Sequence, residues 1–253
     1  MAARTNRINK AISVISGIIA ALLVATAVII AINHYWPKKD NYSSFKNNTS
    51  DLPEVLPVNP INFDALKEQN EDVCAWIKLD CLPIDYPIVR AGENKAEDYY
   101  LRRDLEGKYS TAGTVYIQKM NSVDFSDPCT VVYGHNMRNL SMFGTLKNFR
   151  DKDFFDQNEF FYIYTPHHIL KYAIKSAFVY DDRHLLYSFD FSNYSGFLAF
   201  AGEASNPQSL VKNVRDSVQI KDDSKLVVLS TCTNVDPERY LIVGVLTEDT
   251  KTQ

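Results

Sequence analysis

The sequence predicts a mostly β fold with added helices (α+β): a closed or nearly closed β-barrel decorated by helices and preceded by a transmembrane helix. Seven runs rich in β-branched or aromatic residues are bounded by Gly, Pro, Asp or Asn, a pattern typical of strands and turns. Helical spacing of apolar residues occurs in few segments. Many strands with few helices favour a barrel, in which closure removes the unpaired sheet edges.

The chain begins with a segment suited to cross a membrane. Residues 11–33 contain no charged side chain and are mostly Ala, Val, Ile and Leu. As a helix they extend roughly 35 Å, enough for the hydrocarbon core of a bilayer. Arg4, Arg7 and Lys10 precede this run without an acidic residue, so we expect a single-pass cell-membrane protein with residues 1–10 in the cytoplasm.

A cleaved signal peptide is the alternative for this segment. Residues 25–27 (Ala-Thr-Ala) resemble a cleavage site, but apolar residues continue past them and the run exceeds a typical signal core. Residues 34–60 are polar and contain several prolines, so we expect an extracellular stalk. Residues 61–253 are then one domain, with a usual size for a single hydrophobic core.

Composition limits the partners of this domain. The formal net charge is -4 and no basic stripe is present, which argues against nucleic acid. Four cysteines are too few for a disulfide scaffold of this length, although a Cys74–Cys81 bridge is possible. Cys74 lies in an apolar run and fits a core position.

The expected elements follow from local pattern. Strands are predicted at residues 84–89, 114–118, 130–133, 160–165, 170–180, 225–230 and 240–246. Helices are predicted at residues 62–69, 142–149 and 194–204. In the second of these, Phe143, Leu146 and Phe149 recur at a spacing of three, which places them on one helical face.

Cys232 is the residue that points most directly to chemistry. It follows the apolar run at residues 226–228 within the string Leu-Ser-Thr-Cys-Thr, where a strand is expected to leave the core. An arbitrary cysteine is usually a buried, inert thiol. A thiol at an exposed strand end, with a base near it, can act as a nucleophile in acyl transfer.

His135 and Arg239 occupy similar positions at the ends of expected strands. Each would ordinarily be a structural histidine or a solvated surface charge. Cys232 and Arg239, however, bracket one short connection, so neighbouring strands would bring them to the same end of the sheet. A guanidinium there can hold a substrate carbonyl or a developing oxyanion.

A third member of a catalytic triad is not evident. Asp124, Asp127 and Asn121 lie before His135 and could approach it. The tandem histidines at residues 167–168 point to opposite faces of a strand, and no clustered ligands predict a metal or cofactor.

These strings resemble the sortase family, membrane-anchored cysteine transpeptidases of Gram-positive bacteria. The resemblance is carried by residues 229–232 (Leu-Ser-Thr-Cys) with Arg239, and by residues 133–137 (Tyr-Gly-His-Asn-Met). Further segments resemble the class B branch, namely 63–76, 142–146, 149–155 and 194–204. The resemblance spans about residues 61–248. It implies an eight-stranded β-barrel, an N-terminal helical region and a helix in the connection before the cysteine-bearing strand.

The resemblance also implies roles for individual residues. Cys232 would be the nucleophile, His135 the general acid and base, and Arg239 the cation that stabilises an oxyanion or holds the substrate. Four residues are expected to line the substrate groove: Ser230, Asn121, Tyr133 and Thr231. The connection at residues 233–238 is short for the family, which affects the shape of the groove wall.

The implied reaction has two steps. The thiol attacks a Thr carbonyl in the C-terminal sorting signal of a secreted protein, and a peptidoglycan cross-bridge or stem-peptide amine then takes the acyl group. A free thiol of pKa about 8.5 and a free imidazole of pKa about 6.5 are thiolate and imidazolium together in under about 1% of molecules at pH 7. We therefore expect a slow enzyme with a bell-shaped pH profile.

Three other functions fit the sequence less well. A pilus-assembly sortase uses the same chemistry with a pilin lysine as acceptor, and residues 51–53 (Asp-Leu-Pro) faintly resemble an acidic lid motif. A non-catalytic, anchored β-barrel that binds wall or peptide ligands would leave Cys232 incidental. A papain-like protease is a further alternative, but its Cys-Gly-Ser-Cys-Trp context is absent.

Overall fold

The computed structural model describes residues 25–26, 56–233 and 238–253. The chain divides into two compact units, residues 1–40 and residues 41–253. The expected membrane segment at residues 11–33 lies outside the described residues apart from Ala25 and Thr26, as do residues 1–10 and most of the expected stalk. In the described part of the chain, no helix has the length and apolar character that a membrane crossing needs.

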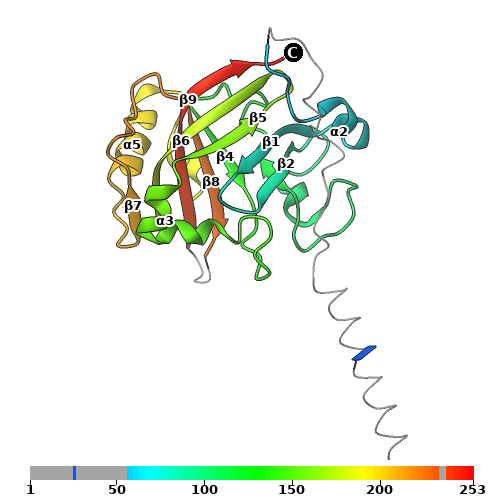
Figure 1. The fold of residues 1–253 in the computed structure, drawn as a ribbon, viewed down its shortest axis with the longest axis horizontal. Coiled ribbons are helices and arrows are strands. Elements are labelled where there is room, and N and C mark those ends of the chain that lie inside the picture. Colours follow the sequence, from blue (N-terminus) through cyan, green and yellow to red (C-terminus); the bar gives the residue numbers. More distant parts are fainter. Residues whose placement is uncertain (1–24, 27–55, 234–237) are drawn as a thin grey trace, which may run out of the picture. The chain divides into compact units, whose positions relative to one another are not determined.

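The second unit contains nine strands and several short helices (Figure 1). The strands are β1 (Val73–Leu79), β2 (Ile84–Arg90), β3 (Val115–Ile117), β4 (Cys129–Tyr133), β5 (Phe160–Tyr164), β6 (His168–Tyr180), β7 (Lys212–Val214), β8 (Leu226–Cys232) and β9 (Arg239–Lys251). The α-helices are α2 (Phe63–Gln69), α3 (Lys152–Gln157), α4 (Leu185–Ser188) and α5 (Tyr194–Ser205). Two 3-10 helices, η2 (Tyr99–Arg102) and η3 (Leu146–Arg150), complete the list.

Eight of the strands close into a barrel. The strand order is β5-β1-β2-β3-β4-β8-β9-β6-β7, and an additional pairing of β5 with β6 closes the ring. β7 lies outside the ring and pairs with β6 at residues 176–178, beyond the stretch that pairs with β5. The neighbours β2–β3 and β4–β8 are parallel, and the others are antiparallel. The predicted eight-stranded barrel with added helices is confirmed.

All seven predicted runs are strands, but two strands were not predicted. β1 is buried at six of its seven positions, so it lacks the alternation of apolar and polar residues that marks a half-exposed strand. β7 has only three residues and no apolar run. β9 continues to Lys251 because its polar end pairs with the beginning of β6, from Leu170↔Asp249 to His168↔Lys251, and this backbone pairing leaves no hydrophobic signal.

Two of the three predicted helices form as expected. α2 begins after Asn62, whose side chain accepts a hydrogen bond from the Ala65 amide, and α5 begins after Asn193, which caps it in the same way. The helix predicted at residues 142–149 is wrong for its first half. Met142 has a φ of 53°, which a right-handed helix does not allow, so only the 3-10 helix η3 forms there.

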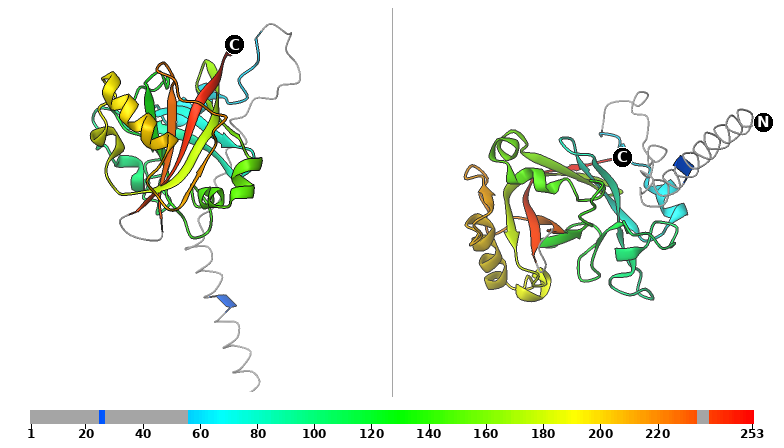
Figure 2. Two further views of the ribbon diagram at one scale, coloured as in Figure 1. Left: turned by 90° about the vertical axis from the view of Figure 1, so that its left-hand side faces the viewer. Right: turned by 90° about the horizontal axis from the view of Figure 1, so that it is seen from below.

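The helices cover the barrel on different sides. Figure 2 shows α5 and α2 on opposite sides of the strands. Phe197 and Phe200 of α5 pack on the outer face of β4, β8 and β9, in a cluster that includes Val131, Val228 and Leu241. The alternate residues of the same strands, such as Val227 and Leu229 of β8, belong to the core cluster inside the barrel. β8 is therefore buried on both faces until it approaches Cys232.

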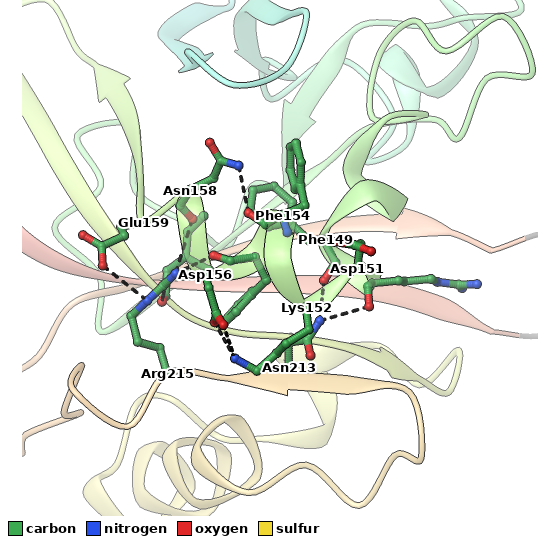
Figure 3. A network of polar contacts seen from close by, with 12 residues as sticks. Phe149, Asp151, Lys152, Phe154, Asp156, Asn158, Glu159, Asn213 and Arg215 are labelled. Carbon is green, nitrogen blue, oxygen red and sulfur yellow. Dashed lines mark hydrogen bonds and ion pairs between the residues drawn. The ribbon is translucent and has the colours of Figure 1, made fainter.

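A polar network holds η3 and α3 against β7 and the residue that follows it (Figure 3). The Asn213 amide donates hydrogen bonds to the carbonyls of Phe149 and Arg150, at 2.8 and 3.1 Å. The Arg215 guanidinium donates to the carbonyls of Ile174 and Phe155, each at 2.5 Å. Because buried carbonyls need donors, these bonds fix the position of η3 at the barrel end.

The last residues of the expected stalk lie against the domain. The buried amide of Asn59 donates to the Thr165 carbonyl at 2.7 Å, and the Gln253 amide donates to the Pro57 carbonyl at 3.3 Å. All four cysteines are free, so the possible Cys74–Cys81 bridge does not form.

Candidate active site

Cys232 and Arg239 face each other across two neighbouring strands. The antiparallel register of β8 and β9 pairs Cys232 with Arg239 at the last step of the ladder. Directly opposed residues in such a pair have Cβ atoms about 4.5–5.5 Å apart and share one face of the sheet. Cys232 and Arg239 therefore project from the same face at the strand end, as their spacing in the sequence predicted.

The strand β4 brings His135 to the same level. The parallel register pairs Tyr133 with Ser230, and the Gly134 amide extends the ladder by donating to the Ser230 carbonyl at 3.2 Å. His135 lies two residues after Tyr133, and Cys232 lies two residues after Ser230. Since side chains alternate along a strand, His135 and Cys232 project from the same outer face as Val131 and Val228, beyond the area that α5 covers.

The backbone before His135 depends on a glycine. A Cβ atom at Gly134 would come within 2.7 Å of the Phe143 ring, so a larger residue would displace that ring. The Phe143 amide donates to the His135 carbonyl at 3.0 Å, which closes the loop that follows β4. His135 is thus held by main-chain contacts on both sides.

The His135 ring is oriented by a backbone carbonyl. Its Nε2 lies 2.7 Å from the Leu101 carbonyl oxygen. Because a carbonyl oxygen only accepts, Nε2 carries a proton, and Nδ1 is the unprotonated nitrogen of the neutral ring. In the described part of the chain no carboxylate bonds to His135, so a Cys-His-Asp triad does not form there.

The electrostatics of His135 favour the neutral ring. Burial lowers the pKa of His135 from its usual value, and the nearby Arg102 charge lowers it further, while the Leu101 carbonyl acts in the opposite direction. Leu101 is itself held in η2, because the adjacent Tyr100 and Arg102 carbonyls accept hydrogen bonds from Thr114 and Ser110. His135 is therefore mainly unprotonated at neutral pH and ready to accept a proton.

A cleft of about 270 Å³ contains all three residues. Its floor is formed by the ends of β3, β4, β8 and β9, and one wall is formed by the connection between β6 and α4. The lining residues are Leu101, Thr114, Tyr116, Gln118, Tyr133, Gly134, His135, Tyr180, Asp181, Asp182, Arg183, His184, Leu185, Ser230, Thr231, Cys232 and Arg239. The structure thus brings Cys232, His135 and Arg239 together in one cleft.

Three of the four expected groove residues line this cleft, and the fourth does not. Ser230, Tyr133 and Thr231 are lining residues. Asn121 is buried, and its amide nitrogen donates to the Cys129 carbonyl at 2.9 Å while its oxygen accepts from the Val131 amide at 3.0 Å. Asn121 therefore supports the beginning of β4 and is placed away from the substrate path.

The acids considered beside His135 also have other partners. Asp127 accepts hydrogen bonds from Asn121 and Ser122, and Asp124 accepts from the Ser126 amide. These bonds stabilise the connection between β3 and β4.

His184 is a cleft residue that sequence reasoning missed. The Gln118 amide nitrogen lies 2.6 Å from His184 Nε2. An amide nitrogen only donates, so His184 Nε2 accepts and Nδ1 carries the proton. That Nδ1 is buried and has no hydrogen-bond partner among the described residues. No local signal marks His184, because it follows a polar Asp-Asp-Arg string that reads as an ordinary loop.

Aromatic residues complete the polar floor of the cleft. Tyr116 and Tyr133 stack with ring centroids 5.3 Å apart, and the Tyr133 hydroxyl donates to Gln118 Oε1 at 3.3 Å. Burial raises the pKa of Tyr116 to about 12, with smaller contributions from nearby negative charges, so its hydroxyl stays protonated. Tyrosine hydroxyls and the Gln118 amide therefore lie along the cleft at the ends of β3 and β4.

The four cysteines differ in exposure. Cys232 is exposed, whereas Cys74 and Cys129 are buried and Cys81 is half-buried. Burial raises the pKa of the Cys74 thiol to about 12 and that of Cys129 further. Neither buried thiol can be an effective nucleophile at neutral pH. Among the described residues, no group of His, Cys, Asp and Glu side chains could hold a metal ion.

Comparison with known proteins identifies the family. No family model matches the chain. Sortase B of Listeria monocytogenes is 28% identical over 186 residues, which cover 72% of each protein. A class B sortase of Streptococcus pyogenes involved in pilus biogenesis is 34% identical in its solved structure, with a TM-score of 0.61, and the match covers 73% of this chain and 97% of that one. The chain belongs to the sortase family.

This sortase is class B-like. The solved structure of Clostridium perfringens sortase B matches it with a TM-score of 0.66 and 27% identity, covering 74% of this chain and 100% of that one. The predicted resemblance is therefore confirmed, and family membership makes this sortase a cysteine transpeptidase. The eight-stranded barrel and the exposed Cys232 agree with membership of this class.

Proposed function

We propose that this sortase cleaves the C-terminal sorting signal of secreted proteins at a Thr carbonyl and transfers the protein to an amine of cell-wall peptidoglycan. The observation that carries the proposal is the placement of exposed Cys232 beside Arg239 and at the level of His135, in one cleft at the strand ends. The cleft is lined by side chains with hydroxyl and amide groups, which can form hydrogen bonds with the backbone of an extended sorting signal.

The first half-reaction forms a thioacyl enzyme. His135 takes the proton of the Cys232 thiol, and Sγ attacks the Thr carbonyl carbon. The oxyanion that develops is stabilised by the Arg239 guanidinium on the opposed strand. The carbon–nitrogen bond then breaks, and the leaving amine takes a proton from His135. The acyl part of the substrate stays bound to Sγ.

The second half-reaction returns the enzyme to its starting state. A neutral amine attacks the thioester carbonyl, the carbon–sulfur bond breaks, and the electron pair returns to Sγ. The extra proton on the attacking nitrogen passes to His135, whose lowered pKa leaves the ring unprotonated for this purpose, and then from His135 to Sγ, which restores the thiol. Amine must outcompete water, so the cleft must restrict water around the thioester.

The N-terminal segment supports a membrane location for this activity. Residues 11–33 are uncharged and apolar, and three basic residues precede them without an acid. A single helix with its N-terminus in the cytoplasm would hold the catalytic domain outside the cell, where secreted substrates emerge and peptidoglycan lies.

A pilus-assembly role is the second candidate. The S. pyogenes class B sortase involved in pilus biogenesis shares 34% identity with this chain, more than the 28% shared with L. monocytogenes sortase B. In that role the same thioacyl enzyme would be attacked by a lysine side chain of a pilin subunit, so the two candidates differ only in the acceptor.

One experiment tests both candidates. The full-length protein is incubated with a pool of synthetic peptides that carry Thr before the scissile bond, and the Cys232 adduct is identified by mass spectrometry. Peptidoglycan fragments and a lysine-containing peptide are then offered as acceptors. We expect an adduct on Cys232 and its transfer to peptidoglycan; transfer only to lysine would favour the pilus role. Absence of any adduct, with the same result for Cys232→Ala, would contradict the enzymatic function.

A further inference from the structure

A buried carboxylate binds the connection between β2 and β3. Asp72, in the turn between α2 and β1, is 7% exposed. Its Oδ1 accepts from the Gly92 amide at 3.1 Å, and its Oδ2 accepts from the Lys95 ammonium and from the Tyr100 hydroxyl, each at 2.6 Å. All three donors belong to residues 91–114, the connection that contains η2. One carboxylate therefore fixes three points of this connection.

Tyr100 is the residue of η2 that this carboxylate holds. It is 1% exposed, and it belongs to an apolar cluster that α2 forms with β1 and β2. Burial raises the pKa of Tyr100, so its hydroxyl keeps the proton that it donates to Asp72. The next residue is Leu101, whose carbonyl accepts from His135 Nε2. The anchored tyrosine is therefore directly bonded to the residue that orients the histidine ring.

Gly113 lies against the same carbonyl group. Its φ is 60°, and a Cβ atom at this position would lie 2.4 Å from the Leu101 oxygen and 2.7 Å from the Tyr100 oxygen. Only glycine allows this backbone conformation and this close approach without strain. The next amide, that of Thr114, donates to the Tyr100 carbonyl at 3.0 Å. The Leu101 carbonyl is thus held by the backbone at residues 113–114 and by the side chain of Tyr100.

The Leu101 carbonyl matters because it orients the His135 ring. A catalytic histidine needs a partner that fixes the position and the tautomer of its imidazole, and in a Ser-His-Asp triad that partner is a carboxylate. In the described part of the chain no carboxylate bonds to His135, and its Nε2 lies 2.7 Å from the Leu101 oxygen instead. A shift of this oxygen would change the orientation of the ring beside Cys232.

We propose that Asp72 and Tyr100 are positioning residues for His135, because they hold the Leu101 carbonyl where it accepts from Nε2. The inference rests on the role of His135 as acid and base in the proposed function. Neither Asp72 nor Tyr100 lines the cleft, so neither contacts substrate. The Lys95 ammonium balances the charge of Asp72, so the carboxylate acts through the geometry of η2 rather than through its field.

The first test removes the anchor and keeps the ring. In Tyr100→Phe, kcat for the sorting peptide should fall roughly tenfold, a part of the about 10²–10⁴-fold that general acid–base catalysis contributes, while KM stays unchanged. Asp72→Asn should act in the same direction, because one amide oxygen cannot accept from all three donors. Asn59→Ala is the control for lost stability. It removes another buried hydrogen bond, beside the beginning of β6, whereas the cleft lies at the end of that strand.

The second test moves the carbonyl without touching the anchor. The Cβ atom of Gly113→Ala would displace the Leu101 oxygen, so kcat should again fall while KM stays unchanged. Gly107→Ala is the matched control, because Gly107 lies in the same connection and has a φ of 74°, so alanine is equally strained there. A Cβ atom at Gly107 would meet only the Tyr99 hydroxyl, at 3.2 Å. Gly107→Ala should therefore leave kcat unchanged.

The protonation of His135 gives a readout that needs no substrate. Full-length protein, isotopically labelled at its five histidines, is titrated by NMR, and the His135 signal is the one that His135→Gln removes. Burial lowers the pKa of His135, and the hydrogen bond to Leu101 acts in the opposite direction. Loss of that bond should lower the pKa further in Tyr100→Phe and Gly113→Ala, but not in the two controls. The charged and titratable residues near the ring are the same in all these variants: Arg102, Asp181, Asp182, Arg183, Cys232 and Arg239.

The outcomes separate positioning from a merely structural role. Equal values of kcat and of the His135 pKa in Tyr100→Phe and in Asn59→Ala would overturn the inference. A lower pKa in Gly113→Ala alone would assign the position of the carbonyl to the backbone and would also overturn it. A wild type that forms no thioacyl adduct on Cys232 would overturn the proposed function, whereas the titration would still decide whether Tyr100 holds the Leu101 carbonyl.

Discussion

The cleft is built from two regions that differ in how their residues are held. The floor consists of strand ends, where His135, Cys232 and Arg239 follow ladders of backbone hydrogen bonds. The wall is the connection from Asp181 to Leu185, which leaves the sheet after β6 and carries His184 into the cleft. The floor is part of the barrel, whereas the wall depends mainly on side-chain contacts such as Gln118 with His184.

This difference suits the floor of the cleft to bond making and its wall to substrate choice. Bond making needs a thiol, an imidazole and a guanidinium in fixed relative positions, and paired strands supply that rigidity. Substrate choice needs groups that can vary without unfolding the domain, and loops on a rigid scaffold supply that freedom. We therefore expect changes in the floor to abolish reaction or folding, and changes in the wall to alter substrate preference.

The largest effect should come from the nucleophile. Cys232→Ala should form no thioacyl adduct, while its free energy of unfolding stays within about 0.5 kcal/mol of the wild type because Cys232 is exposed. Alkylation by a thiol reagent at neutral pH, followed by mass spectrometry, should label Cys232 before Cys74 and Cys129 in the wild type. Faster labelling of a buried cysteine would contradict the assignment of Cys232.

The floor should be far more sensitive to truncation than the wall. Ile242 is fully buried inside the barrel, so Ile242→Ala should lower the free energy of unfolding by roughly 2–5 kcal/mol. Asp182 of the wall is exposed, so Asp182→Ala should change it by less than about 0.5 kcal/mol. Urea unfolding followed by circular dichroism measures both, and similar losses would remove the distinction between the two regions.

A change in the wall should alter substrate use without altering stability. His184→Gln removes the ring that lines the cleft and accepts from the Gln118 amide, so kcat/KM for the sorting peptide should fall about fivefold, as expected for one neutral hydrogen bond. His167→Gln is the matched control, because His167 is exposed and does not line the cleft. An equal fall in both variants would argue against a substrate contact at His184.

The smallest effect should appear in the pH dependence of stability. Burial lowers the pKa of His135 and of His184 in the folded protein, whereas both have a pKa of about 6.5 when unfolded. The unfolded chain therefore binds more protons as the pH falls below about 6.5, so the free energy of unfolding should decrease. Urea unfolding at pH 7.5 and pH 5.5 should show a smaller decrease in His135→Gln than in the wild type. An identical decrease in the variant and the wild type would show that His135 does not contribute to the pH dependence of stability.

The amino-acid sequence by itself determined the barrel and the meeting of Cys232, His135 and Arg239 at its strand ends. Runs of β-branched and aromatic residues predicted seven strands, because their side chains fit a pleated, buried surface. Cys232, His135 and Arg239 were predictable because each lies directly beside such a run, where a strand end meets solvent. Asn62 and Asn193 cap α2 and α5 in the structure for a local reason, since an N-cap needs only its own helix.

The tertiary structure decided what local pattern does not encode. β1 is buried on both faces, so only its pairing with β2 and β5 reveals it as a strand. Met142 reads as part of a helix, but its left-handed backbone is imposed by the loop that closes behind His135. His184 enters the cleft and Asn121 leaves it because of long-range hydrogen bonds to Gln118 and to the β4 backbone. Such contacts join residues far apart in the sequence, so only the folded chain defines them.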